Sequence, residues 1–75
     1  GYVDAMFNLG VIYKDGIGAN QDKVYSHMWW NIAASYGDDE AREERKKLEK
    51  SMTSSQIETA QKLATVCVKK NYKGC

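Results

Sequence analysis

Residues 5–37 read AMFNLGVIYKDGIGANQDKVYSHMWWNIAASYG, a pattern of two helices joined by a glycine-rich corner. Apolar residues recur at helical spacing before Gly16 and again after Asp22, and Gly37 follows the second run. A helical hairpin of this size cannot bury its own apolar face, so such units stack on neighbouring units. A stacked array presents surface but brings no catalytic group with it. The pattern therefore predicts a binding role.

The first helix is expected over residues 3–14. Its main apolar face is predicted from residues at i, i+4, i+7 and i+8, which are Ala5, Leu9, Ile12 and Tyr13. Phe7 and Val11 form a second apolar pair outside that face. A glycine inside a helix costs about 1 kcal/mol relative to alanine, so Gly10 predicts the close approach of another helix.

Glycines also mark the corner after this helix. Gly16 suits the left-handed position that ends a helix, and Gly18 suits a second tight bend. We expect Ile17, between them, to fold back onto the hairpin. Asp22 is the best candidate to cap the second helix, which is expected to run to about Tyr36.

The second half of the sequence predicts two further helices. The third begins at Asp38 or Asp39, and its acidic residues come early and its basic residues late, which suits the helix dipole. Its apolar stripe is narrow and consists of Ala41, Leu48 and Met52. Thr53 and Gln56 have the spacing of a capping box, which predicts a fourth helix running to about Lys70.

Helices joined by such short links predict an all-α fold of stacked αα-hairpins, about four helices in a single compact domain. Residues 1–37 are expected to form one helix-turn-helix repeat. Residues 38–75 are expected to form a degenerate repeat that caps it on the C-terminal side. A chain of 75 residues buries only roughly 60% of the surface that its unfolded form exposes, so stability is expected to be marginal without further support.

The charge balance gives no argument for a polyanionic partner. The chain has 11 basic and 10 acidic residues and a net charge of +1, so we expect neither nucleic acid nor an anionic membrane surface as its partner. No run of about 18 apolar residues occurs, so no membrane span is expected. The sequence also lacks metal-type ligand spacing, and we expect no metal and no cofactor.

The chain contains two cysteines, Cys67 and Cys75. A disulfide closing the short loop between them would stabilise so small a domain. The alternative is one buried thiol and one exposed thiol. If the two are paired, the compartment is oxidising, and the protein is expected to be periplasmic or secreted.

A spaced set of residues within 5–37 resembles the Sel-1-like repeat. The set consists of Ala5, Leu9, Gly10, Tyr13, Gly16, Gly18, Asp22, Trp29, Ala33, Ala34 and Gly37. Ala19 and Ser26 depart from the pattern, which usually has valine and alanine there, so this repeat is expected to be slightly looser. The resemblance implies a tetratricopeptide-like α–α superhelix.

Two features near the end of the chain extend this resemblance. Residues 52–64 are similar to the helix that often closes bacterial proteins of this type. The spacing of Cys67 and Cys75 looks like the pairing in the disulfide-rich secreted members of the superfamily. The resemblance therefore favours the disulfide over the two free thiols.

His27 is the only histidine, and it follows Ser26 directly. Adjacent helical residues do not face each other, so the two are not expected to form a nucleophile–base pair. His27 is expected at the surface of the second helix. Trp29 matches a core position of the Sel-1-like repeat, whereas Trp30 is either buried or partly exposed and available to a partner.

The candidate partner-binding residues are Tyr2, Met6, Phe7, Val11 and Trp30. In related helical arrays the first helix of each pair lines the concave face, so Tyr2, Met6, Phe7 and Val11 contact a protein or peptide, or pack on a preceding repeat. Self-association through the same open face is a further expectation. We expect a non-catalytic protein–protein interaction module or scaffold and not an enzyme. The alternative that the resemblance implies is a small secreted hydrolase or β-lactam-binding protein, which no set of residues here supports.

Overall fold

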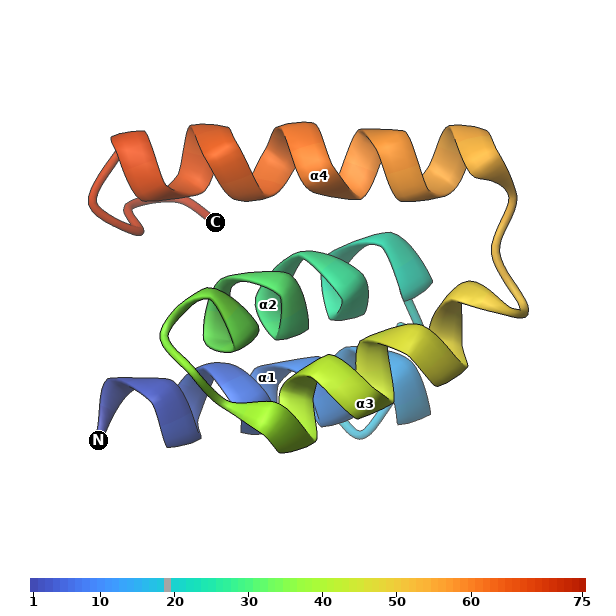
Figure 1. The fold of residues 1–75 in the computed structure, drawn as a ribbon, viewed down its shortest axis with the longest axis horizontal. Helices are drawn as coiled ribbons and strands as arrows, with labels where there is room; N and C mark the ends of the chain where they lie inside the picture. The colour runs from blue at the N-terminus through green and yellow to red at the C-terminus, as the bar shows by residue number, and fades with distance from the viewer. Residues whose placement is uncertain (19) are drawn as a thin grey trace.

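The computed structural model describes residues 1–18 and 20–75, so the departure from the repeat pattern at Ala19 lies outside the described residues. The described residues form helices α1 (Tyr2–Asp15), α2 (Lys23–Ser35), α3 (Asp39–Glu49) and α4 (Ser54–Lys69), shown in Figure 1. The prediction of an all-α fold with four helices is confirmed. The helix ends also agree closely with those predicted from the sequence.

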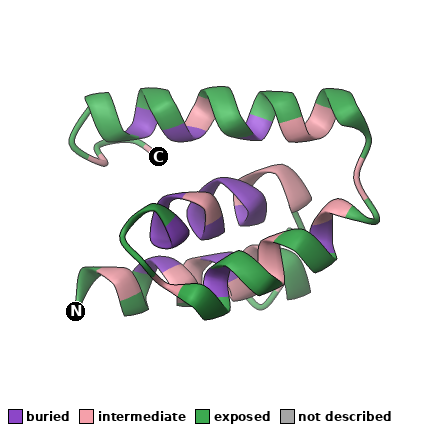
Figure 2. Ribbon diagram, viewed as in Figure 1, coloured by how far each residue is buried: buried purple, intermediate pink, exposed green. Residues whose placement is uncertain are grey.

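Helix α2 is the centre of the fold. It packs against each of the other three helices, with α4 along one side of it and α1 and α3 along the other (Figure 1). Most of its residues are buried, as Figure 2 shows. A helix that is apolar around most of its circumference belongs in a core. Helices α3 and α4 each pack on α2 more closely than on each other, so they cover the first hairpin from two sides and do not form a tight second hairpin.

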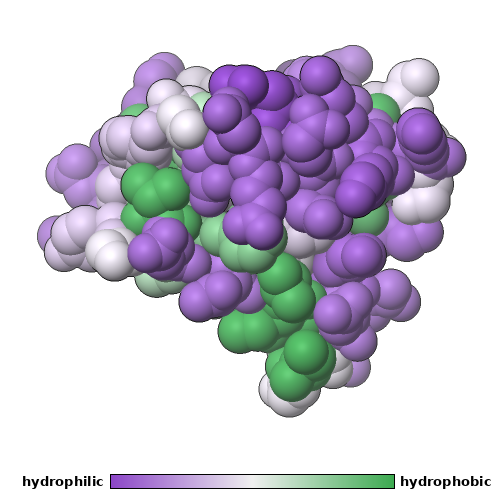
Figure 3. Space-filling view, turned by 60° about the horizontal axis from the view of Figure 1, so that its bottom comes forward, coloured by the Kyte–Doolittle hydropathy of each residue, from purple (hydrophilic) through white to green (hydrophobic). Residues whose placement is uncertain are grey.

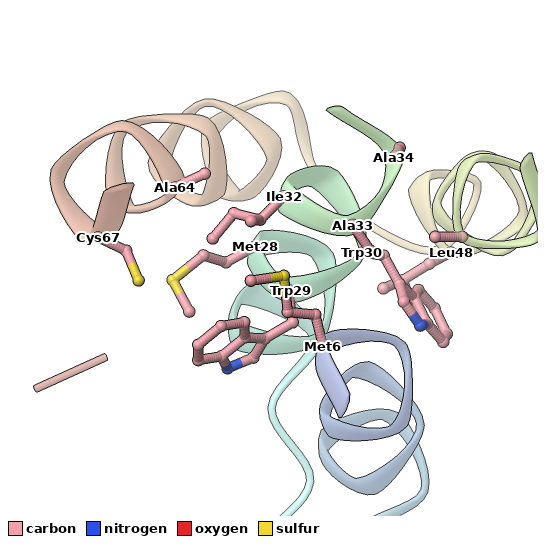
Figure 4. Close-up of a cluster of buried hydrophobic side chains, with 11 residues drawn as sticks. Met6, Met28, Trp29, Trp30, Ile32, Ala33, Ala34, Leu48, Ala64 and Cys67 are labelled. Atoms are coloured by element: carbon pink, nitrogen blue, oxygen red, sulfur yellow. The ribbon is translucent and has the colours of Figure 1, made fainter. Parts of the chain in front are cut away.

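The core gathers side chains from all four helices around α2. Figure 4 shows Met6 of α1, Leu48 of α3 and Cys67 of α4 arranged around its tryptophans, Met28 and Ile32. The narrow contribution of α3 is as predicted, since its buried residues are Ala41 and Leu48.

At Gly10 the backbone of α1 lies directly against a side chain of α2. A Cβ atom at this position would overlap the indole ring of Trp30, so the ring can lie against the backbone of α1 only because the residue is glycine. The Ser26 hydroxyl donates a hydrogen bond to the Gly10 carbonyl (2.7 Å), and the Trp30 indole N–H donates to the Phe7 carbonyl (3.1 Å). Ser26 therefore adds a specific link where a looser contact was expected.

The face that α1 turns toward α2 differs from the predicted one. Met6 and Gly10 are its buried residues, whereas Ala5, which was assigned to the inner face, is exposed. The prediction of this face was wrong, because α1 is rotated about its axis relative to the predicted orientation. The close approach of Trp30 at Gly10 places Met6, one turn before Gly10, against α2. Leu9 and Tyr13 are half-buried at the edges of this contact.

The predicted helix ends are confirmed by their capping groups. Gly16 ends α1 in the left-handed conformation (φ 72°), and the Asp22 side chain accepts a hydrogen bond from the Tyr25 N–H (3.0 Å) at the start of α2. Thr53 and Gln56 form the complete capping box at the start of α4. The expectation for Ile17 was wrong: its side chain is 60% exposed, because the two bends around it direct the corner away from the hairpin.

Candidate functional site

An apolar groove of about 750 Å³ opens between α1 and the turn that follows α4. Its lining comes from α1, from α2 and the residue after it, and from the C-terminal turn: Tyr2, Val3, Ala5, Met6, Leu9, Trp29, Tyr36, Asn71 and Tyr72. Met6 and Trp29 are buried and form its floor. Tyr2, which is 87% exposed, and Tyr36 stand at its rim. The groove thus has an apolar floor and tyrosines at its mouth.

The floor carries one polar group without a partner. The indole nitrogen of Trp29 is buried and donates no hydrogen bond within the described part of the chain, although the residue is only 6% exposed. Figure 4 shows this nitrogen on the side of the ring turned away from Ile32 and Cys67. An unpaired buried N–H costs about 1–3 kcal/mol. By contrast, the neighbouring Trp30 indole N–H is bonded to Phe7.

The C-terminal turn forms the second wall of the groove and is held at several points. Cys67 and Cys75 are paired in a disulfide with their Cα atoms 5.7 Å apart, as the first of the two alternatives predicted. Within this loop Asn71 (φ 54°) and Tyr72 (φ 65°) both adopt the left-handed conformation, which costs roughly 1–2 kcal/mol per residue for non-glycine residues. The disulfide helps to hold this costly backbone, and with it the wall of the groove.

The C-terminal turn is also joined to the end of α2, where the hydroxyl of Tyr36 hydrogen-bonds to the hydroxyl of Tyr72. This bond is the main cause that raises the pKa of Tyr72 above its ordinary value of 10.0, because a hydrogen bond that the neutral hydroxyl donates favours the protonated form. Desolvation and the charge that Tyr36 would itself acquire act in the same direction. The bond therefore joins the end of α2 to the C-terminal turn at neutral pH.

An acidic hollow of about 610 Å³ adjoins the groove. It lies between the first turns of α1 and the corner that leads from α2 to α3, and its lining is Val3, Asp4, Phe7, Asn8, Tyr36, Gly37, Asp38 and Glu40. Val3 and Tyr36 line both the hollow and the groove, so the two lie side by side. On the face in Figure 3 hydrophilic residues predominate, and hydrophobic ones are confined to separate patches.

The predicted binding residues do not all line the groove or the hollow. Tyr2 and Met6 line the groove, and Phe7 lines the hollow while its ring also packs on Trp30 with centroids 6.1 Å apart. Val11 is half-buried and lines neither. Of the two positions left open for Trp30, the structure shows the buried one: the residue is 1% exposed, because Gly10 allows its ring to fill the space between α1 and α2.

Sequence reasoning missed several residues of the groove. Trp29 was assigned to the core, which is correct, but its unpaired N–H has no sequence signature. Asn71, Tyr72 and Tyr36 were placed in turns or at a helix end and given no binding role. The cysteine spacing was the one available signal, since it predicts that the turn containing Asn71 and Tyr72 is held against the body of the domain.

His27 does not lie at the surface as predicted. It is fully buried, because α2 is covered by helices on three sides, and its Nε2 lies 2.7 Å from Glu49 Oε2. Ser26 is committed instead to the Gly10 carbonyl, so the two residues form no nucleophile–base pair. Within residues 1–18 and 20–75 no group of three or more histidine, cysteine or acidic side chains is arranged to hold a metal ion.

The helices of the described residues include none with the length and apolar character needed to cross a membrane. Comparison of the chain with family models, with curated proteins and with solved structures found no match.

Proposed function

We propose that this chain is a non-catalytic protein–protein interaction module whose groove binds a segment of a partner protein. The observation that carries the proposal is the unpaired indole N–H of Trp29 in the floor of an open apolar groove. A partner segment with an apolar side chain and a hydrogen-bond acceptor fills the apolar groove and accepts the unpaired N–H.

The composition of the rim supports a protein partner. Tyr2, Tyr36 and Tyr72 present large amphipathic surfaces around the buried Trp29. Tyrosine and tryptophan are enriched at protein interfaces because each offers apolar contact area together with a hydrogen-bonding group. A groove of about 750 Å³ lies within the range of volumes that is typical of ligand-binding sites.

The relationship to Sel-1-like repeats belongs to the same proposal. The α1–α2 hairpin, with Gly10 against its partner helix, supports it. In such an array the outer surface of α1 is the side on which another repeat, or a second copy of the chain, would stack. The paired Cys67 and Cys75 support a periplasmic or secreted location, where disulfides persist.

A variant that fills the groove tests the proposal without disturbing the core. Ala5 is exposed and lines the groove, so Ala5→Arg places a long side chain there while keeping a good helix former. Gln61→Arg, at an exposed position of α4 outside the groove, is the control matched in charge. Each protein is immobilised and used to select from a display library of random peptides. We expect enrichment on the wild type and on Gln61→Arg, and none on Ala5→Arg; equal enrichment on all three contradicts the proposal.

A further inference from the structure

From the groove and the hollow together we infer that the partner segment carries an apolar side chain close to a lysine or arginine. This inference rests on the proposed function and specifies the chemistry of the partner. The apolar side chain occupies the groove above Met6 and Trp29, and the basic side chain occupies the acidic hollow.

The acceptor for Trp29 comes from the partner's own backbone. The apolar side chain enters between α1 and the C-terminal turn, so the main-chain carbonyls beside it pass over the floor of the groove. One of them can accept the indole N–H that has no partner within the described residues of the free protein. Since the nitrogen is covered before binding, the lining side chains part as the segment enters.

The charge of the hollow selects the second side chain. Asp4, Asp38 and Glu40 contribute three carboxylates to its lining, which includes no lysine or arginine. Asp38 accepts the Ala41 N–H at the start of α3, and Asp4 lies 3.5 Å from the amino group of Gly1. Glu40 is in no ion pair within the described residues. A hollow of this composition attracts a cation and repels an acidic side chain.

The distance between the two side chains follows from the residues that the groove and hollow share. Val3 and Tyr36 line both, so a segment in the groove has the hollow directly beside it. The basic residue therefore lies close in sequence to the apolar one, and three extended residues span about 10 Å. The exposed ring of Tyr36 lies at this boundary, where an ammonium or guanidinium group can pack on its face.

The composition of peptides selected on the wild-type protein tests the inference. We expect enriched sequences that pair leucine, isoleucine, methionine or phenylalanine with lysine or arginine within about three positions. Enrichment of apolar peptides without a basic residue, or with an acidic one, overturns the inference but leaves the proposed function standing. If no peptide is enriched over the bare support, both the inference and the proposed function are wrong.

Binding of a synthetic copy of the most enriched peptide then tests whether its basic residue lies in the hollow. Glu40→Gln is expected to weaken binding about two- to fivefold, as for a single exposed ion pair, while Glu43→Gln, which lies on α3 outside the hollow, leaves it unchanged. Replacing the peptide's basic residue by norleucine should abolish the difference between wild type and Glu40→Gln. If Glu40→Gln and Glu43→Gln bind the basic peptide equally, the hollow is not where the basic residue lies.

The two indole N–H groups provide an internal comparison by nuclear magnetic resonance. Their signals are assigned from Trp29→Phe, which removes one of them. On addition of the peptide we expect the Trp29 signal to move as it gains an acceptor and the Trp30 signal to stay, since Trp30 is already bonded to Phe7. A bound state in which the Trp29 signal does not move overturns the role assigned to this N–H.

Discussion

The hydroxyl of Tyr36, directly after α2, is hydrogen-bonded to the hydroxyl of Tyr72 in the turn that follows α4. The two residues are 36 positions apart in the chain, yet their bond joins the end of α2 to the C-terminal turn, and both residues line the groove. The position of the C-terminal turn therefore depends on this bond and on the disulfide between Cys67 and Cys75.

Tyr36→Phe is expected to lower the pKa of Tyr72 toward its ordinary value of 10.0, because the hydrogen bond with Tyr36 is the largest cause of the upward shift. A pKa raised by folding contributes stability that is present below the unfolded value. That contribution is lost as the pH rises above about 10 through the folded pKa. Tyrosinate absorbance measured against pH checks the shift. Tyr2→Phe is the control, and the same Tyr72 titration in Tyr36→Phe as in the wild type contradicts the prediction.

Opening the disulfide is expected to destabilise the domain. Closing a loop of eight residues contributes about 2.5 kcal/mol through the entropy of the unfolded chain, so Cys75→Ser should lower the melting temperature by roughly 10–20 °C. Thermal unfolding with and without a dithiol reductant checks this. The reductant should affect the wild type and not Cys75→Ser, and a wild type that melts at the same temperature in both conditions rules the prediction out.

Gly10→Ala is expected to destabilise the fold, although alanine is the better helix former by about 1 kcal/mol. The added methyl group overlaps the Trp30 ring, and relieving such overpacking typically costs about 1–3 kcal/mol. Urea unfolding measures the difference. Asn8→Ala, at an exposed position of the same helix, is the control and should be neutral or slightly stabilising. A gain of stability in Gly10→Ala would show that the ring moves aside freely.

Glu49→Ala is expected to cost about 1–3 kcal/mol, because it leaves the fully buried imidazole of His27 without its hydrogen-bond partner. Glu58→Ala, which removes an exposed ion pair with Lys62, is the control and should change stability by less than about 1 kcal/mol. A double-mutant cycle with His27→Leu isolates the coupling between the two residues. A coupling energy near zero means that the pair does not stabilise the fold.

Much of the fold was predictable because helix ends depend on neighbouring residues. The left-handed Gly16, the N-cap Asp22 and the Thr53–Gln56 capping box each act within a few positions of the chain. The inner face of α1 was not predictable from apolar spacing alone. It is set by the contact of Gly10 with Trp30, and Ala5 was placed wrongly for that reason, while the position of Trp30 stayed open.

The candidate site was predictable only in part. Tyr2 and Met6 follow from the idea of an open α1 surface, and the turn containing Tyr72 follows from the cysteine spacing. The unpaired Trp29 N–H and the burial of His27 do not follow from any local pattern. Both depend on which helices surround α2.

The sequence by itself established four capped helices, their order, and a pair of cysteines placed to close the final turn. These features follow from spacing, capping and backbone preference, which act over one helical turn. The arrangement of three helices around α2, the buried His27 and the apolar groove beside an acidic hollow came from the tertiary structure. Their physical reason is close packing between residues far apart in the chain, because such packing fixes the rotation of each helix and the polar groups left without partners.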